Sequence, residues 1–182
     1  MSVPLKTFIR GARCLEIYSD ENPHNPRDDD NFGKMICFHK RYSLGDKHEV
    51  KHSDFSGWIE MEKHLHKTYE IVLPLYLMDH SGISVSLSPF GCNWDSGQVG
   101  FICASKSDIR KNFLIKKVYP PHLLKALEIL KAEVQTYDAY LRGDILGYKL
   151  FENGTEIESC WGFYSLNDIL SETGFKDQKQ EG

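Results

Sequence analysis

Short segments rich in apolar, β-favouring residues recur along this 182-residue chain, and one of them, 82–90, alternates strictly between apolar and polar positions, as in a half-buried β-strand. We expect strands at residues 13–18, 34–42, 70–78, 82–90 and 98–105. The run at 70–78 is almost continuously apolar, as in a buried strand, although Pro74 favours a sheet edge or a bulge. The sequence DHSG, Asp79 to Gly82, predicts the turn that follows this run.

One long amphipathic helix is predicted at about residues 121–142, because Pro120-Pro121 precedes the segment and Gly143 follows it. Its apolar residues recur every three or four positions, at Leu123, Leu127, Leu130, Val134, Tyr137 and Leu141. This seam predicts a helix packed on a sheet, with a partner-facing or dimer seam as the alternative. Shorter helices are expected near 55–67 and 165–172.

The last strands form a hairpin in this interpretation, because Asn153-Gly154 separates the apolar segments 146–151 and 156–164. The predicted class is therefore α+β, with a mostly antiparallel sheet packed by one long helix and two shorter helices. We expect a single globular domain at 1–170 and a polar, disordered tail at 171–182.

The composition is that of a globular protein, with 41% hydrophobic and 26% charged residues. No stretch approaches the roughly 20 apolar residues that span a bilayer, and the first residues lack the apolar core of a signal peptide. We therefore expect a cytoplasmic protein without a membrane partner. The five cysteines form no CxxC pair, so we expect reduced thiols rather than a disulfide framework.

Charge is distributed unevenly, although the net charge is only −4. Residues 16–30 and the segment from 152 onward are acidic, whereas residues 105–125 are basic. The candidate nucleic-acid- or partner-binding residues of the basic segment are Lys106, Arg110, Lys111, Lys116 and Lys117. Basic side chains bind phosphate oxygens without reading bases, so this segment predicts weak, salt-sensitive DNA binding. The alternative is an ordinary solvated surface.

A second basic segment contains interleaved histidines, and it could likewise bind phosphate groups or form ordinary surface. Its residues are Lys34, His39, Lys40, Arg41, Lys47, His48, Lys51 and His52.

Two polar turns could converge on one edge of the predicted sheet. Asp79, His80 and Asp95 would then form an open metal site suited to hydrolysis of a phosphodiester. Asp and Ser beside Gly are also common turn formers, so turn structure is the simpler interpretation. A contact with a partner is a third alternative.

Motifs for other chemistries are missing. The sequence contains no Walker motif, no GxGxxG after a strand, no GxSxG and no HExxH. Cys92 or Cys103 beside His80 or His39 could in principle act as a nucleophile, but no local feature would lower a thiol pKa, and we expect Cys37 and Cys103 to be buried structural thiols. We expect no cofactor and identify no catalytic residue.

Several blocks of the chain resemble a family of small proteins carried by phages and mobile elements of gut Firmicutes. The blocks, between residues 13 and about 164, are LEIYSDENPHNPR, GKMICFHKRYSLGD, LPLYLMDHSGISVS, CNWDSGQVGFI, YDAYLRGDILGY and SCWGFY. The whole chain, including its length, is similar to an anti-CRISPR member that inhibits type II-A Cas9.

The resemblance implies an inhibitor that acts in the bacterial host cell, binds Cas9 or its guide-RNA complex, and blocks cleavage of target DNA, with weak non-specific binding to double-stranded DNA. It carries over no catalytic residue. Two alternatives come from the residues alone: a metal-dependent hydrolase of nucleic acid or nucleotide, and a DNA-binding accessory protein of a mobile element.

Overall fold

A computed structural model describes residues 3–92 and 94–176 of the chain. It is an α+β fold in which all strand pairs of the described residues are antiparallel. The chain folds into two compact units. Among the described residues, unit 1 combines the segment up to His24 with the segment from Arg142 onward, and unit 2 comprises Asn25–Leu141.

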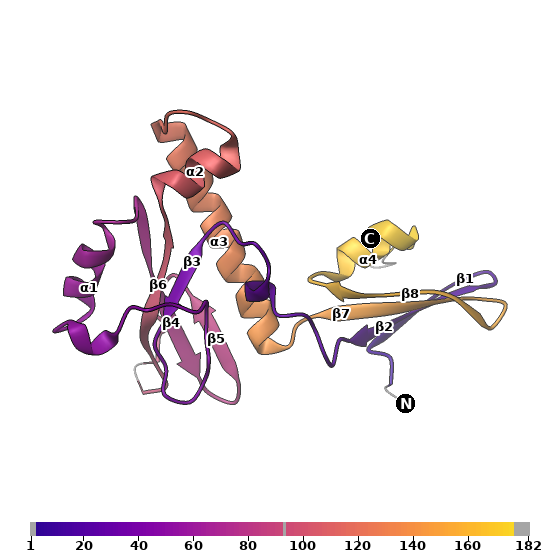
Figure 1. Cartoon of the computed structure of the whole chain (residues 1–182). Helices are drawn as coiled ribbons and strands as arrows, with labels where there is room; N and C mark the ends of the chain where they lie inside the picture. The colour runs from indigo at the N-terminus through magenta and orange to yellow at the C-terminus, as the bar shows by residue number, and fades with distance from the viewer. Residues whose placement is uncertain (1–2, 93, 177–182) are drawn as a thin grey trace. The chain divides into compact units, whose positions relative to one another are not determined.

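Unit 2 is built on a four-stranded sheet of order β3-β6-β4-β5 (Figure 1). Its strands are β3 (Lys34–Cys37), β4 (Ile71–Asp79), β5 (Ile83–Ser86) and β6 (Ser96–Ala104). Its helices are α1 (Trp58–Leu65), α2 (Lys106–Phe113) and α3 (Pro120–Arg142), and the short 3-10 turns are η1 (Pro26–Asp28) and η2 (His52–Asp54).

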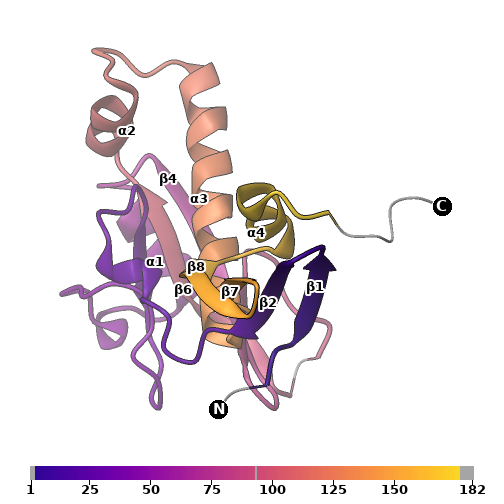
Figure 2. The same cartoon turned by 90° about the vertical axis from the view of Figure 1, so that its right-hand side faces the viewer.

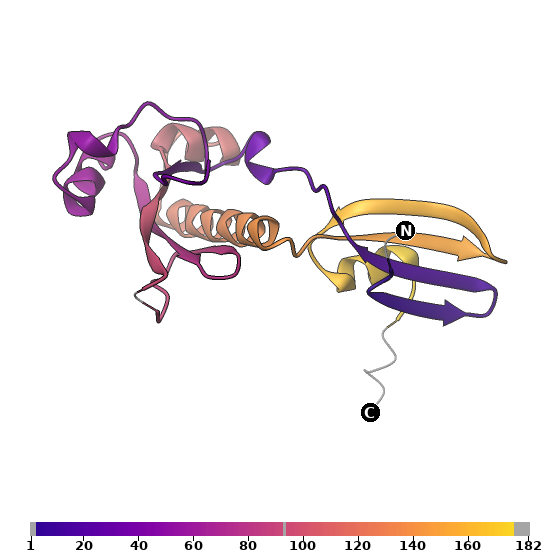
Figure 3. The ribbon, with the colours of Figure 1, turned by 90° about the horizontal axis from the view of Figure 1, so that it is seen from below.

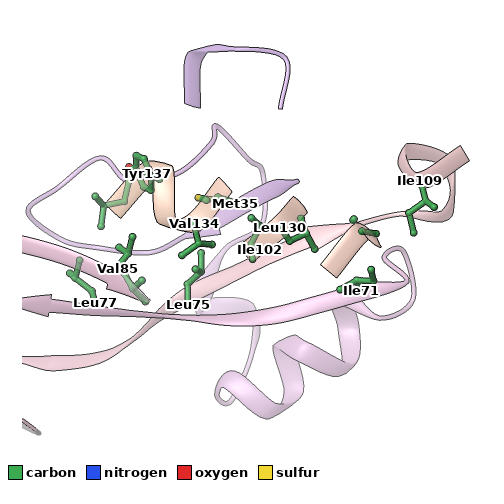
Figure 4. Packing of buried hydrophobic residues seen from close by; sticks show 14 residues of the cluster. Met35, Ile71, Leu75, Leu77, Val85, Ile102, Ile109, Leu130, Val134 and Tyr137 are labelled. Atoms are coloured by element: carbon green, nitrogen blue, oxygen red, sulfur yellow. The ribbon is translucent and has the colours of Figure 1, made fainter. Parts of the chain in front are cut away.

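The alternation of β-strand side chains gives this sheet two buried faces. On one face, Met35, Ile102 and Leu75 pack against Leu130 and Val134 of α3 (Figure 4). On the other face, Ile36, Val72 and Phe101 pack with Met61 and Leu65 of α1. The predicted seam of the long helix is therefore a core seam, and all six of its residues belong to the α3 side of the core.

Pro74 lies in the part of β4 that pairs only with β6, because β5 pairs with Tyr76–Asp79. The register shifts between Leu75 and Tyr76, immediately after this proline. The prediction of an edge or a bulge is thus confirmed, since one side of β4 is free at Pro74 and the lost N–H donor breaks no ladder bond there.

Unit 1 contains a second four-stranded sheet, of order β1-β2-β7-β8 (Figure 3). Its strands are β1 (Lys6–Arg10), β2 (Arg13–Ser19), β7 (Leu146–Glu152) and β8 (Thr155–Phe163). Helix α4 (Leu166–Thr173) covers one face of this sheet (Figure 2). Its Ile169 and Leu170 pack there with Leu15, Tyr148 and Leu150. The predicted hairpin is confirmed: β7 pairs with β8, and Asn153 and Gly154 adopt positive φ in the turn.

Several details differ from the sequence prediction. The strands form two sheets, each with its own core, because β2 pairs with β7 of the late hairpin rather than with β3. The domain predicted at 1–170 is thus divided into two compact units. The predicted tail overlaps ordered structure, since α4 extends to Thr173 and Phe175 is buried; the rest of that tail, 177–182, lies outside the described residues. Strand β1 and helix α2 were not predicted.

Candidate functional site

The basic segment forms helix α2, the loop after it and the first turn of α3. Helix α2 begins with a capping box, in which Ser105 Oγ accepts from the Asp108 amide at 3.2 Å and Asp108 Oδ2 accepts from the Ser105 amide at 2.9 Å. Ile109 anchors the helix in the α3 side of the core. Phe113 stacks on His122 of α3 with ring centroids 6.1 Å apart, so α2 and the start of α3 lie together.

The five predicted binding residues differ in their surroundings, although all are exposed. Lys106 forms an ion pair with Glu70 at 3.0 Å, and Lys111 lies 3.8 Å from Asp30. Arg110, Lys116 and Lys117 form no ion pair with any described residue. The basic character is therefore strongest at these last three positions.

Large apolar side chains accompany these cations. Leu114 is 91% exposed, and Tyr119 and Leu124 are also exposed. Leu114 ends α2 in the left-handed conformation, with φ of 53°, which turns the chain toward α3. We call this set the α2–α3 surface: Arg110, Leu114, Lys116, Lys117, Tyr119 and Leu124.

Leu114 and Leu124 were missed in the sequence analysis. A signal for Leu124 was present, because it lies outside the seam that begins at its neighbour Leu123. No comparable pattern identifies Leu114, whose exposure depends on where α2 ends.

The two polar turns meet at the edge of the sheet of unit 2, as the metal-site hypothesis requires. His80 Nδ1 lies 2.9 Å from Asp95 Oδ2, and the Asp79 amide donates to the Asp95 carbonyl at 2.8 Å. The Asp79 carboxylate, however, accepts from Arg41 and from the Tyr42 hydroxyl. Among described residues, no group of three or more His, Cys, Asp or Glu side chains could hold a metal ion.

The turn interpretation accounts for the same residues. Ser81 and Gly82 adopt φ of 56° and 149°, and the His80 amide donates to the Gly82 carbonyl at 3.0 Å. The Arg41–Asp79 pair then links the segment after β3 to the end of β4. These contacts stabilise a turn, and they occupy the Asp79 carboxylate that the metal site would need.

All five cysteines are free thiols, and the two in the core of unit 2 are poor nucleophiles. Burial and the nearby charge of Asp46 raise the pKa of Cys37 to about 12. Burial and the neighbouring Cys37 raise the pKa of Cys103 to about 12. Because the thiolate is the nucleophilic form, neither thiol is suited to act as a nucleophile. Cys103 is fully buried, as predicted, whereas Cys37 is only half-buried.

A buried arginine network is the most elaborate polar cluster that the sequence analysis missed. Arg27 Nη2 and Nε bind both carboxylate oxygens of Asp46 at 2.7 and 2.9 Å, and Nη1 binds Glu133 at 3.0 Å. Glu133 also accepts from the amides of Phe32 and Gly33, and Asp46 accepts from the amide of Met35. The network therefore fixes the loop before β3 to α3, and its role is structural.

Comparison with protein-family models, curated proteins and solved structures found no match to this chain. Among the described residues, the helices are too short or too polar to span a lipid bilayer. The functional argument therefore depends on the surfaces of the chain itself.

Proposed function

We propose that this protein is an anti-CRISPR inhibitor that binds Cas9 or the Cas9–guide RNA complex and blocks cleavage of target DNA in the cytoplasm of the bacterial host cell. The observation that supports it best is the α2–α3 surface. Exposed leucines and a tyrosine lie there beside cations that have no carboxylate partner among the described residues.

A mixed surface of this kind suits a partner that contains both protein and nucleic acid. The apolar side chains would be buried against protein, and Arg110, Lys116 and Lys117 would contact phosphate groups. Cas9 holds its nucleic acids in positively charged channels, so a bound phosphate backbone is available there beside protein. The sequence blocks that resemble an anti-CRISPR protein point to the same partner.

Weak binding to double-stranded DNA belongs to this proposal. Three unpaired cations can neutralise only a few phosphates, so the affinity would be low, independent of base sequence and sensitive to salt. The net charge of −4 opposes binding to DNA over the rest of the chain. Cas9 is therefore proposed as the primary partner and DNA as a secondary one.

The experiment is co-elution with purified Cas9 on size exclusion, with and without guide RNA, followed by a titration of DNA cleavage. We expect a complex, and we expect cleavage to reach zero near a fixed molar ratio of protein to Cas9. Treating the inhibitor stock with a chelator should leave this ratio unchanged.

Two outcomes would contradict the proposal. Inhibition at strongly substoichiometric amounts, with Cas9 or guide RNA chemically altered, would identify an enzyme. A shift of DNA mobility with neither co-elution nor inhibition would identify a DNA-binding accessory protein of a mobile element.

A further inference from the structure

Two adjoining clefts lie on unit 2 near the end of β3. The larger, of about 850 Å³, is lined by Cys37, Phe38, His39, Lys40, Arg41, His52 and Trp58. The smaller, of about 340 Å³, shares Phe38, His39 and Arg41 with it and adds Trp94 and the start of β6. Clefts of this size are typical of sites for small molecules or single nucleotides.

Aromatic rings line the larger cleft in a fixed arrangement. The rings of Phe38 and Trp58 lie 6.1 Å apart, and His52 meets Trp58 edge-on at 4.9 Å. Trp58 in turn packs edge-on against the buried Phe101 at 5.9 Å. Because the core holds these rings, they are preorganised and lose little side-chain entropy on binding a flat ligand.

Trp94 is 95% exposed at the smaller cleft, which is unusual for the largest apolar side chain. It follows Asn93, which lies outside the described residues, and precedes Asp95 of the polar turn. An indole ring in this position offers a stacking surface to a ligand.

Cationic and donor groups accompany the rings. Lys40 is exposed, and the Arg41 side chain is 69% exposed although it is paired with Asp79. His39 Nδ1 accepts from the amides of Arg41 and Tyr42 at 3.3 and 3.2 Å, which leaves Nε2–H as a donor. Donors and cations thus surround an aromatic cleft.

We propose that these two clefts form a binding site for single-stranded nucleic acid, in which bases stack on Trp94 and on the Phe38–Trp58 rings while Lys40 and Arg41 contact phosphates. Aromatic platforms beside cations are the usual means of holding unpaired strands. In a duplex the bases stack on one another, so their faces are closed to these rings. The α2–α3 surface, by contrast, suits a phosphate backbone in either form.

The test uses fluorescence anisotropy of three labelled probes at low salt: a 12-mer of thymidylate, an abasic 12-mer and a 12-bp duplex. We expect the thymidylate strand to bind more tightly than the abasic strand, because only the former can stack. Equal affinities for these two strands would overturn the proposal, as would failure of all probes to bind.

The variant that tests the site is Trp94→Ala with Lys40→Gln, and both residues are exposed, so the fold should be kept. We expect it to lose about fivefold or more in affinity for thymidylate and clearly less for the abasic strand, which loses the Lys40 phosphate contact but has no base to stack. The matched control is Ile59→Ala with Lys63→Gln, which removes an exposed apolar group and an exposed cation on α1. Equal loss in both variants would contradict the proposal.

A third variant separates this inference from the proposed function, on which it does not depend. With Arg110, Lys116 and Lys117 of the α2–α3 surface changed to Glu, we expect thymidylate binding to remain, even if Cas9 inhibition and duplex binding are lost. Loss of thymidylate binding in that variant would place the single strand on the α2–α3 surface and overturn the inference.

Discussion

At the scale of single residues, the groups that surround a side chain determine whether it can bind a metal or only stabilises the local fold. His80 and Asp95 come within 2.9 Å of each other, as a metal site or an acid–base pair would require. The third group, the Asp79 carboxylate, already accepts from a guanidinium and a hydroxyl. The sequence predicted that these residues would meet, but it could not predict that Arg41 and Tyr42, nearly 40 positions earlier, would occupy Asp79.

Replacing Asp95 with Asn tests the turn interpretation. We expect a loss of about 0–1 kcal/mol in the free energy of unfolding, because the pair with His80 is largely exposed and solvent screens it. Urea unfolding gives this value, and isothermal titration with Mn²⁺ or Zn²⁺ should show no metal binding that depends on Asp95. Such binding in the parent protein, lost in a stable variant, would show that the turns hold a metal.

The two thiols of raised pKa, buried Cys103 and half-buried Cys37, give a second prediction at this scale. With its pKa raised to about 12 and its side chain buried, Cys103 should stay unmodified by iodoacetamide at pH 8 in the folded protein and react only in denaturant. The pKa of half-buried Cys37 is also raised to about 12, so it should react much more slowly in the folded protein than in denaturant. The exposed Cys92 should react in both states and serves as the internal control. Mass spectrometry of the alkylated peptides measures each site, and rapid native modification of Cys103 would contradict its burial.

At the scale of elements, the sequence pattern predicted the helices and strands whose apolar residues recur regularly or whose turns have a characteristic sequence. It failed for elements that bury few residues. The seam of α3 and the Asn153-Gly154 turn are strong local signals, and both were predicted. Helix α2 has a single buried residue, Ile109, so its sequence resembles a charged surface segment rather than an amphipathic helix. The capping-box residues Ser105 and Asp108 were the one sequence signal for the start of this helix. Strand β1 has no buried residue, and only its pairing with β2 defines it.

The Arg27 network predicts an unusually large effect for one substitution. Arg27→Met should lower the free energy of unfolding by about 3–5 kcal/mol, because it leaves Asp46 and Glu133 without their buried cation. The matched control, Arg41→Met, breaks an ion pair of an exposed arginine and should cost about 0–1 kcal/mol. Chemical denaturation measures both variants, and equal losses would show that the network is not structurally important.

At the scale of the whole molecule, the sequence predicted the class and the charged segments but not the division into two sheets. That division depends on the pairing of β2 with β7, which follows the long helix α3 in the sequence. Several segments before and after α3 are apolar enough to pair with β2, so the sequence pattern does not select β7. The candidate surfaces also depend on this scale, because the α2–α3 surface joins residues of two helices and a loop, and the aromatic clefts join β3, η2, α1 and the turn before β6. The sequence analysis identified the cations of the α2–α3 surface and the basic and histidine residues of the clefts, which are His39, Lys40, Arg41 and His52. It did not identify the aromatic residues Phe38, Trp58 and Trp94 of the clefts.

The charge of the α2–α3 surface leads to the last prediction, which concerns binding to double-stranded DNA. If Arg110, Lys116 and Lys117 bind phosphates, changing all three to Glu should nearly eliminate duplex binding. The slope of log K against log salt concentration should fall in magnitude by about 0.9 for every phosphate that is no longer neutralised, because fewer counterions are released.

The matched control for this prediction changes the exposed Lys63, Lys67 and Lys131 to Glu, which alters the net charge equally at other places. Anisotropy titrations of a labelled duplex at several salt concentrations measure both variants. If both weaken binding equally, only net charge matters, and if the first variant keeps the parent's slope, the α2–α3 surface is ordinary solvated surface.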